Sequence, residues 1–321
     1  MRTTIVGGAG FIGSHFVDHL LGEASNEVCI FDNFTSGRRW HFAHHLGDPR
    51  LTIVEGDAED LRKLRSAVDG SERIIHLASN PDIARAMTDP TIDFYQGTVL
   101  TNSVVEAARL TGVSEILYAS GSGVYGDWGE QEMTEDHGPL LPTSPYGASK
   151  LAGEALLSAY SSMFGIAVSA FRFGNVVGPR QTHGVGFDFI RRLRGEPTTL
   201  TILGDGLQSK SYVHVNDVVN AVLAMSSTRE ADFEVHNVAT GDHITVREIA
   251  FLALEVLNID PLSCEFIYTG GSRGWKGDVP VVRLSTSKAR GRGWRCSLSS
   301  RDALKAAMTS MVNEAEHGLL E

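Results

Sequence analysis

A chain of 321 residues is long enough for a complete α/β domain with a smaller appended one, and too long for a lone binding module. Its hydrophobic fraction of 42% is typical of a globular protein, and its formal net charge of -11 argues against a nucleic-acid partner, because a phosphate-binding surface needs clustered Lys and Arg. The three cysteines are odd in number and lack metal-ligand spacing, which favours reduced thiols in the cytoplasm.

Targeting and membrane signals are not evident in the sequence. A strand-like run begins at residue 3, so we expect no signal peptide ahead of the fold, and we find no apolar stretch long enough to span a membrane. We therefore expect a cytoplasmic protein with no membrane partner.

The first half of the chain alternates between short β-rich runs and helical patterns. Strands are predicted at 3–6, 27–31, 51–54, 73–77, 115–119 and 167–173, and helices at 11–21, 58–68, 91–110 and 146–163. Such alternation predicts a Rossmann-type α/β fold, a doubly wound parallel sheet with its active site at the carboxyl ends of the strands.

The pattern becomes irregular after about residue 179. Loop-like segments predominate there, with two further helices predicted at 217–225 and 245–257. We therefore predict a first domain over residues 1–178 and a smaller, interleaved C-terminal cap over residues 179–321 that contributes substrate contacts, with some of its segments returning to the first domain.

A glycine-rich turn, Gly7-Gly8-Ala9-Gly10-Phe11-Ile12-Gly13, follows the first strand and opens the first helix. Gly7 permits a tight turn, Gly10 lets the backbone approach a pyrophosphate, and Gly13 allows close packing of helix on strand. The start of the helix, at Phe11 and Ile12, then presents its positive dipole end to the phosphates. An ordinary glycine-rich turn is the alternative, but the strand–turn–helix context favours a dinucleotide site.

Asp32 ends the second strand and is followed by Asn33. A carboxylate at this place binds both ribose hydroxyls and repels a 2′-phosphate, which favours NAD over NADP. Asp57 follows the third strand, where the adenine is expected, although a helix N-cap before Ala58 is an equally good interpretation and both roles are compatible.

The sequence Tyr146-Gly147-Ala148-Ser149-Lys150 places a phenol and an ammonium on one face of a helix. Tyr has a reference pKa of about 10 and is a poor base at neutral pH. A nearby ammonium and a positively charged nicotinamide ring favour the phenolate, so the pair can remove a proton from an alcohol. A surface helix pair is the alternative, which the upstream glycine motif disfavours.

Several motifs together resemble the extended short-chain dehydrogenase/reductases, and among them the NAD-dependent nucleotide-sugar epimerases and dehydratases. The resemblance runs nearly from end to end and rests on Gly7–Gly13, Asp32, Gly56-Asp57, His76-Leu77-Ala78, Val124-Tyr125-Gly126, Ser144-Pro145-Tyr146 with Lys150, Asn175–Arg180, Gly204–Gln208 and Gly274–Asp278.

The resemblance implies further roles. NAD is the expected cofactor, with Ala78, Tyr146 and Lys150 among its contacts, and a homodimer is expected through the helices at 91–110 and 146–163. Asn175 and Arg273 are expected at the substrate diphosphate. Lys210 stands where many relatives have an Arg, and it lacks that residue's bidentate fork.

The chain departs from the family in the loop before Val124-Tyr125-Gly126. Relatives carry a Ser or Thr four residues before that Tyr, where this chain has Gly121. Either Ser122, which we favour, or Ser120 must then supply the hydroxyl that bonds the reacting sugar oxygen. The Asp-Glu pair that 4,6-dehydratases place directly after the Thr is replaced by Ser122 and Gly123, which argues against a standard 4,6-dehydratase.

A second departure concerns substrate size. Relatives restricted to unsubstituted hexoses have a Tyr four residues after the Asp of the late Gly-Asp motif, and counting from Asp278 gives Val282 here. The smaller side chain leaves room for a 2-acetamido group and favours UDP-N-acetylglucosamine.

These features predict an NAD-dependent enzyme that processes a nucleotide-sugar through a transient 4-keto intermediate. With its altered loop, the chain as a whole is similar to the 5,6-dehydratases that act on UDP-N-acetylglucosamine in tunicamycin biosynthesis. A 4-epimerase acting on UDP-hexoses or UDP-N-acetylhexosamines is the alternative. A non-catalytic NAD-binding regulator is a more distant one, because both Tyr146 and Lys150 are present.

Overall fold

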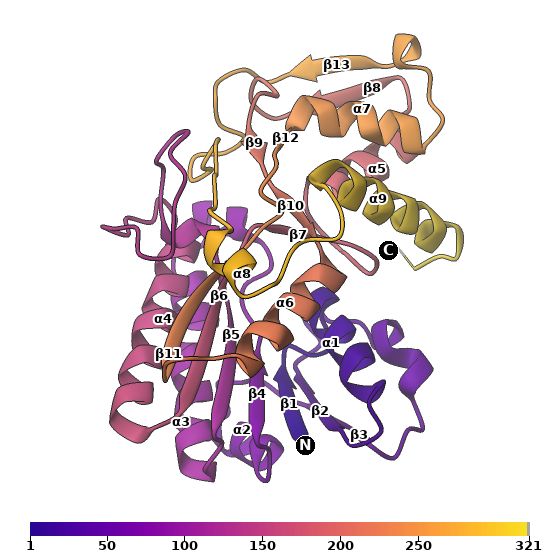
Figure 1. Ribbon diagram of the computed structural model, residues 1–321. Helices are drawn as coiled ribbons and strands as arrows, with labels where there is room; N and C mark the ends of the chain where they lie inside the picture. Colours follow the sequence, from indigo (N-terminus) through magenta and orange to yellow (C-terminus); the bar gives the residue numbers. More distant parts are fainter. Residues whose placement is uncertain (320–321) are drawn as a thin grey trace. The chain divides into compact units, whose positions relative to one another are not determined.

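The computed structural model describes residues 1–319 and divides the chain into two compact units (Figure 1). The first unit comprises Met1–Val124, Ser144–Arg172 and Val219–His236, and the second comprises Tyr125–Thr143, Phe173–Val218 and the described part of the remaining chain from Asn237. Each unit is built from segments that are distant in the sequence. Within the described residues, no helix is both long and apolar enough to cross a membrane.

A seven-stranded sheet of the order β11-β6-β5-β4-β1-β2-β3 organises the first unit. Its strands are β1 (Arg2–Val6), β2 (Glu27–Asp32), β3 (Leu51–Glu55), β4 (Arg73–His76), β5 (Glu115–Gly121), β6 (Ala167–Phe173) and β11 (Phe233–Val238). The pairs from β3 through β2, β1 and β4 to β5 are parallel. Strand order 3-2-1-4-5-6 is that of the Rossmann fold, so the predicted fold class is confirmed.

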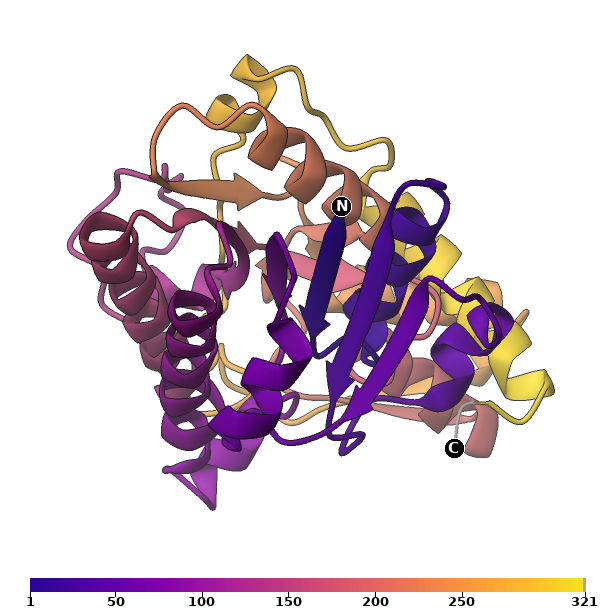
Figure 2. The ribbon, with the colours of Figure 1, turned by 90° about the horizontal axis from the view of Figure 1, so that it is seen from below.

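Helices cover both faces of this sheet (Figure 2). Helices α2 (Leu61–Val68), α3 (Leu100–Thr111) and α4 (Pro145–Phe164) pack side by side on one face, and a continuous apolar core joins them to the strands. On the other face α1 (Phe11–Leu21) packs against η1 (Arg39–His45). Right-handed crossovers between parallel strands produce this arrangement.

The second unit has its own apolar core, in which α5 (Val185–Gly195), α7 (Val246–Val256) and α9 (Ser300–Glu316) pack together. Its strands form three small pairs: β7 (Asn175–Val177) with β10 (Tyr212–His214), β9 (Ser209–Lys210) with β12 (Ile244–Thr245), and β8 (Thr199–Ile202) with β13 (Glu265–Tyr268).

The remaining helical elements of the described chain are η2 (Ile83–Met87), η3 (Phe94–Val99), η4 (Ser122–Val124), α6 (Val215–Ser227), η5 (Pro261–Ser263) and α8 (Ser287–Gly291).

The structure corrects several predicted boundaries, including three in the first unit. Helix α2 starts at Leu61 and not at 58, because the Asp60 carboxylate accepts hydrogen bonds from the Arg62 and Lys63 amides and caps the helix there. The helix predicted at 91–110 begins with a π-helical turn, η3, before α3. Strand β5 continues to Gly121, two residues beyond its predicted end.

Candidate functional site

The glycine-rich turn between β1 and α1 forms a cradle whose close backbone packing excludes side chains at Gly7 and Gly13. Gly7 has a φ of +87°, and a Cβ added there would lie 2.7 Å from the Ala78 amide nitrogen. A Cβ on Gly13 would collide with the Gly7 carbonyl oxygen. Gly10 caps α1 without a side-chain hydrogen bond, and a Cβ there would meet only the Gly7 oxygen, at 3.3 Å. The backbone at Gly10 is therefore uncrowded beside the start of α1, whose first amides have no partner within the helix, as binding of a diphosphate requires.

Phe11 and Ile12, the first residues of α1, follow this turn. Phe11 is buried and lies edge-to-face on His15, with ring centroids 5.9 Å apart, whereas Ile12 is half-buried. Phe11 thus anchors the helix start in the core, and Ile12 retains surface for a bound group.

Asp32 ends β2 and is held beside the cradle. Its Oδ2 accepts the Ala9 amide at 2.9 Å, and its Oδ1 accepts the Phe34 amide at 2.8 Å. Burial raises the pKa of this carboxyl, and these two hydrogen bonds offset part of the rise. The carboxylate is therefore fixed at the carboxyl end of β2, the place at which a ribose is bound in Rossmann folds.

Asn33 and Asp57 lie together at the ends of β2 and β3. Asn33 Nδ2 donates to Asp57 Oδ2 at 3.1 Å, and Asp57 Oδ1 accepts the Glu59 amide at 2.9 Å. The interpretation of Asp57 as a helix N-cap is wrong, since Asp60 caps α2. Asp57 instead braces the loop between β3 and α2.

Tyr146 and Lys150 lie on successive turns of α4, where Ser144 caps the helix and Pro145 begins it. Lys150 is buried and its Nζ donates to the Ala119 carbonyl at 2.8 Å, 5.5 Å from the centroid of the half-buried Tyr146 ring. Burial lowers the pKa of Lys150 to about 8 and raises the pKa of Tyr146 to about 12. The phenol of the chain alone is thus protonated at neutral pH, and positive charge added beside it is needed for its use as a base.

A buried carboxylate beside this pair was not predicted from the sequence. Asp93 Oδ1 accepts Asn80 Nδ2 at 2.9 Å, whereas its Oδ2 is buried and has no hydrogen-bond partner among residues 1–319. Its negative charge raises the pKa of both Tyr146 and Lys150. At the sequence level Asp93 is an unremarkable acid in the first turn of a predicted helix, so no signal marked it.

Ser79 is the second polar side chain beside Tyr146. Its Oγ is buried and makes no hydrogen bond of ordinary geometry among residues 1–319, yet it is close enough to the phenol to offset part of the rise in the pKa of Tyr146. Ser79 and Asp93 therefore leave buried polar atoms beside Tyr146 and Lys150, as expected where a further polar group is to be bound.

Replacing Asp93 with Asn should move the alkaline limb of the kcat/KM pH profile to lower pH. The Asp93 charge favours the Lys150 ammonium, so its removal lowers the Lys150 pKa below about 8, and activity that needs the ammonium is lost at a lower pH. The control is Asp89→Asn, because that side chain is 42% exposed and pairs with Arg85. If the alkaline limb of Asp93→Asn stays at the same pH, the Asp93 charge does not raise the pKa of Lys150.

The two candidate serines, one at the end of β5 and one just after it, lie in different surroundings. Ser120 is buried, and its Oγ donates to Glu154 Oε1 at 2.5 Å. Glu154 is also held by Arg172, whose Nε and Nη2 donate to its two oxygens at 3.0 and 2.7 Å. Ser120 is therefore part of a buried structural network that joins β5 and β6 to α4.

Ser122 is half-buried and begins the short turn η4. The turn lies on the start of α4, since a Cβ added to Gly123 would be 3.4 Å from the Gly147 Cα. A Cβ added to Gly121 would meet nothing within 4 Å. The position at which relatives carry a hydroxyl thus borders open space, and Ser122 is the serine outside the Glu154 network.

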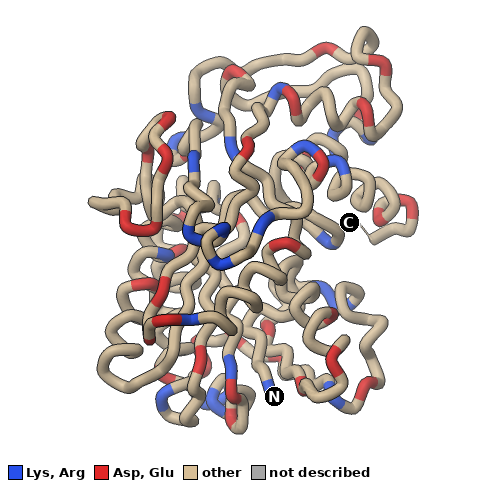
Figure 3. The backbone as a smooth tube through the Cα atoms, in the orientation of Figure 1, with Lys and Arg blue, Asp and Glu red and all other residues tan. Residues whose placement is uncertain are grey.

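The residues predicted to bind substrate lie in the second unit, and each is described within that unit. Lys210 Nζ lies 2.6 Å from Asp278 Oδ1, and Arg273 bonds the Asp278 carbonyl at 2.6 Å and Asp127 Oδ2 at 2.7 Å. Asp278, which the sequence did not single out as a site residue, thus organises both cations. Figure 3 shows acidic residues spread along the whole backbone, so an anionic substrate needs such local cations.

The other two predicted substrate residues differ in exposure. Asn175 is exposed at the start of β7, and its Nδ2 donates to the Ser211 carbonyl at 3.3 Å. Val282 is buried, and its amide donates to the Ser209 carbonyl at 3.3 Å. The structure therefore brings Lys210 and Arg273 to a common partner and buries Val282.

The chain matches the NAD dependent epimerase/dehydratase family over residues 3–239. It is 34% identical over 255 residues to a UDP-glucose 4-epimerase of Mycolicibacterium smegmatis, covering 78% of this chain and 80% of that one. A crystal structure of a UDP-galactose 4-epimerase is 36% identical with a TM-score of 0.85 and coverage of 98% and 99%.

A second solved structure, a dTDP-glucose 4,6-dehydratase from Streptomyces venezuelae with NAD bound, is 29% identical with a TM-score of 0.90 and full coverage of both chains. The similar proteins thus include both epimerases and dehydratases of nucleotide-sugars. The cradle between β1 and α1 and the Tyr146–Lys150 pair fit NAD and its chemistry. This chain belongs to the NAD-dependent epimerase/dehydratase family and is an enzyme that acts on nucleotide-sugars.

Proposed function

We propose that this enzyme removes water between C5 and C6 of UDP-N-acetylglucosamine through a 4-keto intermediate. The observation that carries the proposal is the loop from Gly121 to Gly123. It lacks the family hydroxyl at Gly121 and the Asp-Glu pair of the 4,6-dehydratases, and it borders open space at Gly121. The buried Val282, in place of a larger Tyr, supports a substrate with a 2-acetamido group.

The geometry of the first unit supports the following catalytic roles. Bound NAD supplies the hydride acceptor for C4 of the sugar. Tyr146, as phenolate, takes the proton of the C4 hydroxyl, and the Lys150 ammonium favours the phenolate while it is held by the Ala119 carbonyl. The Ser122 hydroxyl bonds the same sugar oxygen, and the resulting ketone acidifies the C5 hydrogen.

The overall reaction removes water from the sugar with no net oxidation or reduction. The C5 hydrogen leaves as a proton, the C6 hydroxyl leaves as water, and a double bond forms between C5 and C6. Reduction of the C4 ketone restores the alcohol, with Tyr146 returning its proton. The product is therefore the 5,6-ene of the nucleotide-sugar, lighter than the substrate by one water.

A 4-epimerase is the second candidate, favoured by the identity to UDP-glucose and UDP-galactose 4-epimerases. Both reactions share oxidation at C4 by Tyr146 and Lys150. They diverge in the fate of C5 and C6, because an epimerase keeps the C5 hydrogen and forms only the galacto-configured sugar.

A time course of the enzyme with UDP-N-acetylglucosamine in deuterated water, followed by proton NMR, separates the two candidates. We expect vinyl proton signals of an exocyclic alkene and loss of the C5 signal. A galacto-configured product alone, with the C5 hydrogen kept, would overturn the dehydratase in favour of the epimerase. UDP-glucose is the control for the 2-acetamido group.

The Lys210, Arg273 and Asn175 side chains are proposed to hold the substrate diphosphate. Lys210 and Arg273 already share Asp278 as a partner, so their positions are set before substrate arrives.

A homodimer through the region of α3 and α4 is proposed as well, supported by exposed apolar side chains there: Phe94, Tyr95, Leu110, Met163 and Phe164.

NAD should bind more tightly than NADP, because the Asp32 carboxylate faces the position of a 2′-phosphate. Two backbone amides hold this carboxylate, so moving it away from a bound 2′-phosphate would break both hydrogen bonds. Titration with each cofactor measures the preference, and Asp32→Ala should weaken it. Equal affinities in the unaltered enzyme would show that Asp32 does not discriminate.

A further inference from the structure

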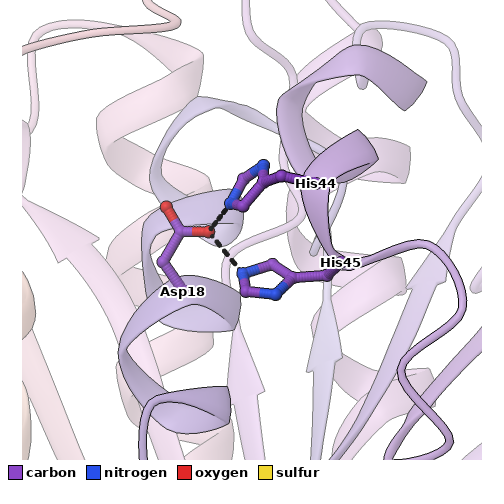
Figure 4. A group of neighbouring side chains, drawn as sticks. All are labelled: Asp18, His44 and His45. Carbon is purple, nitrogen blue, oxygen red and sulfur yellow. Dashed lines mark hydrogen bonds and ion pairs between the residues drawn. The ribbon is translucent and has the colours of Figure 1, made fainter.

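Three side chains of metal-binding type converge on the surface of the first unit, outside the residues assigned to cofactor and catalysis. His44 and His45 come from the end of η1, and Asp18 from α1. Both imidazoles place Nε2 against the same oxygen, Asp18 Oδ1, at 2.8 and 2.9 Å (Figure 4). Among residues 1–319 they form the group of three such side chains whose ligand atoms all lie within 4.8 Å.

The spacing of these atoms is close to that of a metal site. In a tetrahedral site with bonds of about 2.0–2.1 Å, neighbouring ligand atoms are roughly 3.3 Å apart. The two nitrogen–oxygen separations need to open by only a few tenths of an ångström to admit an ion between the three atoms. Small rotations of the side chains provide this, because the His44 side chain is 51% exposed and the Asp18 side chain 29%.

The charges also favour a cation. One carboxylate oxygen accepts two imidazoles whose ring centroids are 4.2 Å apart, so two imidazolium ions there would repel each other. A divalent ion supplies positive charge at one point and uses both imidazoles in their neutral form. Two imidazoles and a carboxylate suit Zn²⁺, with water in the remaining position on the exposed side.

We propose that Asp18, His44 and His45 bind a divalent cation, best matched by Zn²⁺. The site would tie α1 to η1, and both elements border the cofactor cradle. Helix α1 begins at the glycine-rich turn, and within η1 the His41 ring contacts the Ala9 carbonyl of that turn at 2.8 Å. Cation binding would therefore clamp the two segments against each other and stabilise the first unit.

The metal-free enzyme, titrated with Co²⁺ and with Zn²⁺, tests the proposal. We expect one equivalent to bind, with a Co²⁺ visible spectrum of nitrogen and oxygen ligands and without thiolate charge transfer. Zn²⁺ should raise the Tm, since an ion that binds the folded chain stabilises it by mass action. Each of His44→Ala, His45→Ala and Asp18→Asn should weaken binding by at least the roughly 10–100-fold that loss of an outer-shell partner costs.

His19→Ala is the matched control. His19 is exposed, adjoins Asp18 on α1 and is not part of the cluster, so its removal should leave cation affinity unchanged. His44 is the decisive variant, since its exposure lets the chain fold without it, and circular dichroism verifies this. Absence of binding, or equal Zn²⁺ affinity in the unaltered enzyme and His44→Ala, would overturn the proposal. Sugar turnover is not part of the test, so its outcome is independent of the proposed function.

Discussion

Replacing Tyr146 with Phe should reduce turnover by about 10²–10⁴-fold, the usual effect of a positioned proton-transfer group. The substitution removes only the hydroxyl and keeps the ring beside Lys150. NAD binding should therefore change little, and fluorescence titration of the cofactor checks this. Full activity of the Phe variant would show that another group takes the C4 hydroxyl proton.

The pH dependence of the unaltered enzyme provides a second measurement of the same base. Burial raises the pKa of Tyr146 to about 12 in the chain alone, so the phenolate is scarce at neutral pH. Positive charge from the nicotinamide ring lowers that pKa. Turnover should then rise with pH through a pKa well below 12, and this acidic limb should disappear in Tyr146→Phe, leaving only residual activity.

The fold was predictable where hydrophobic periodicity and strand–turn–helix order agree. Helix α1 and strand β6 have the predicted bounds, and the strand order follows from alternating strands and helices. The start of α2 was not predictable in this way, because Asp57 and Asp60 are both residues of a type that caps helices, and the structure shows Asp60 as the cap.

The second unit was harder to predict. Helices α5 and α9 were not predicted, although α5 follows Gly184 and α9 has a capping Ser299 whose hydroxyl accepts the Asp302 amide.

The seventh strand of the large sheet, β11, was not predicted either, because it lies far along the chain from the other strands of the sheet. Contacts between segments distant in sequence decide these elements, and local patterns do not carry that information.

In the candidate site, too, local structure was predictable from the sequence and contacts between distant segments were not. Motifs with fixed spacing predicted the glycine cradle and the Tyr146–Lys150 pair, because a helical turn and a tight turn are local structures. Asp93 and Asp278 were missed, because their importance comes from burial beside groups distant in the sequence. For Ser120 and Ser122 the sequence left two choices open, and their surroundings in the structure now favour different roles.

Ser122→Ala should slow turnover by about 10²–10⁴-fold while leaving NAD binding unchanged, if its hydroxyl replaces the one missing at Gly121. Ser120→Ala is the matched control, since it removes the same atom two residues earlier in the chain. Ser120 donates to the buried Glu154, so its loss should cost about 1–3 kcal/mol of stability and leave most of the activity. Thermal unfolding and initial rates of both variants separate the two roles.

The opposite result, an active Ser122→Ala and an inactive but folded Ser120→Ala, would mean that the hydroxyl comes from Ser120. A third variant tests the position itself. A side chain at Gly121 meets no atom within 4 Å of its Cβ, so Gly121→Ser should fit without strain. Added to Ser122→Ala, it restores a hydroxyl at the position where relatives carry one, and it should recover much of the lost turnover. Failure of this rescue, in a folded double variant that binds NAD, would show that Ser122 acts from a position that a family-type hydroxyl does not reach.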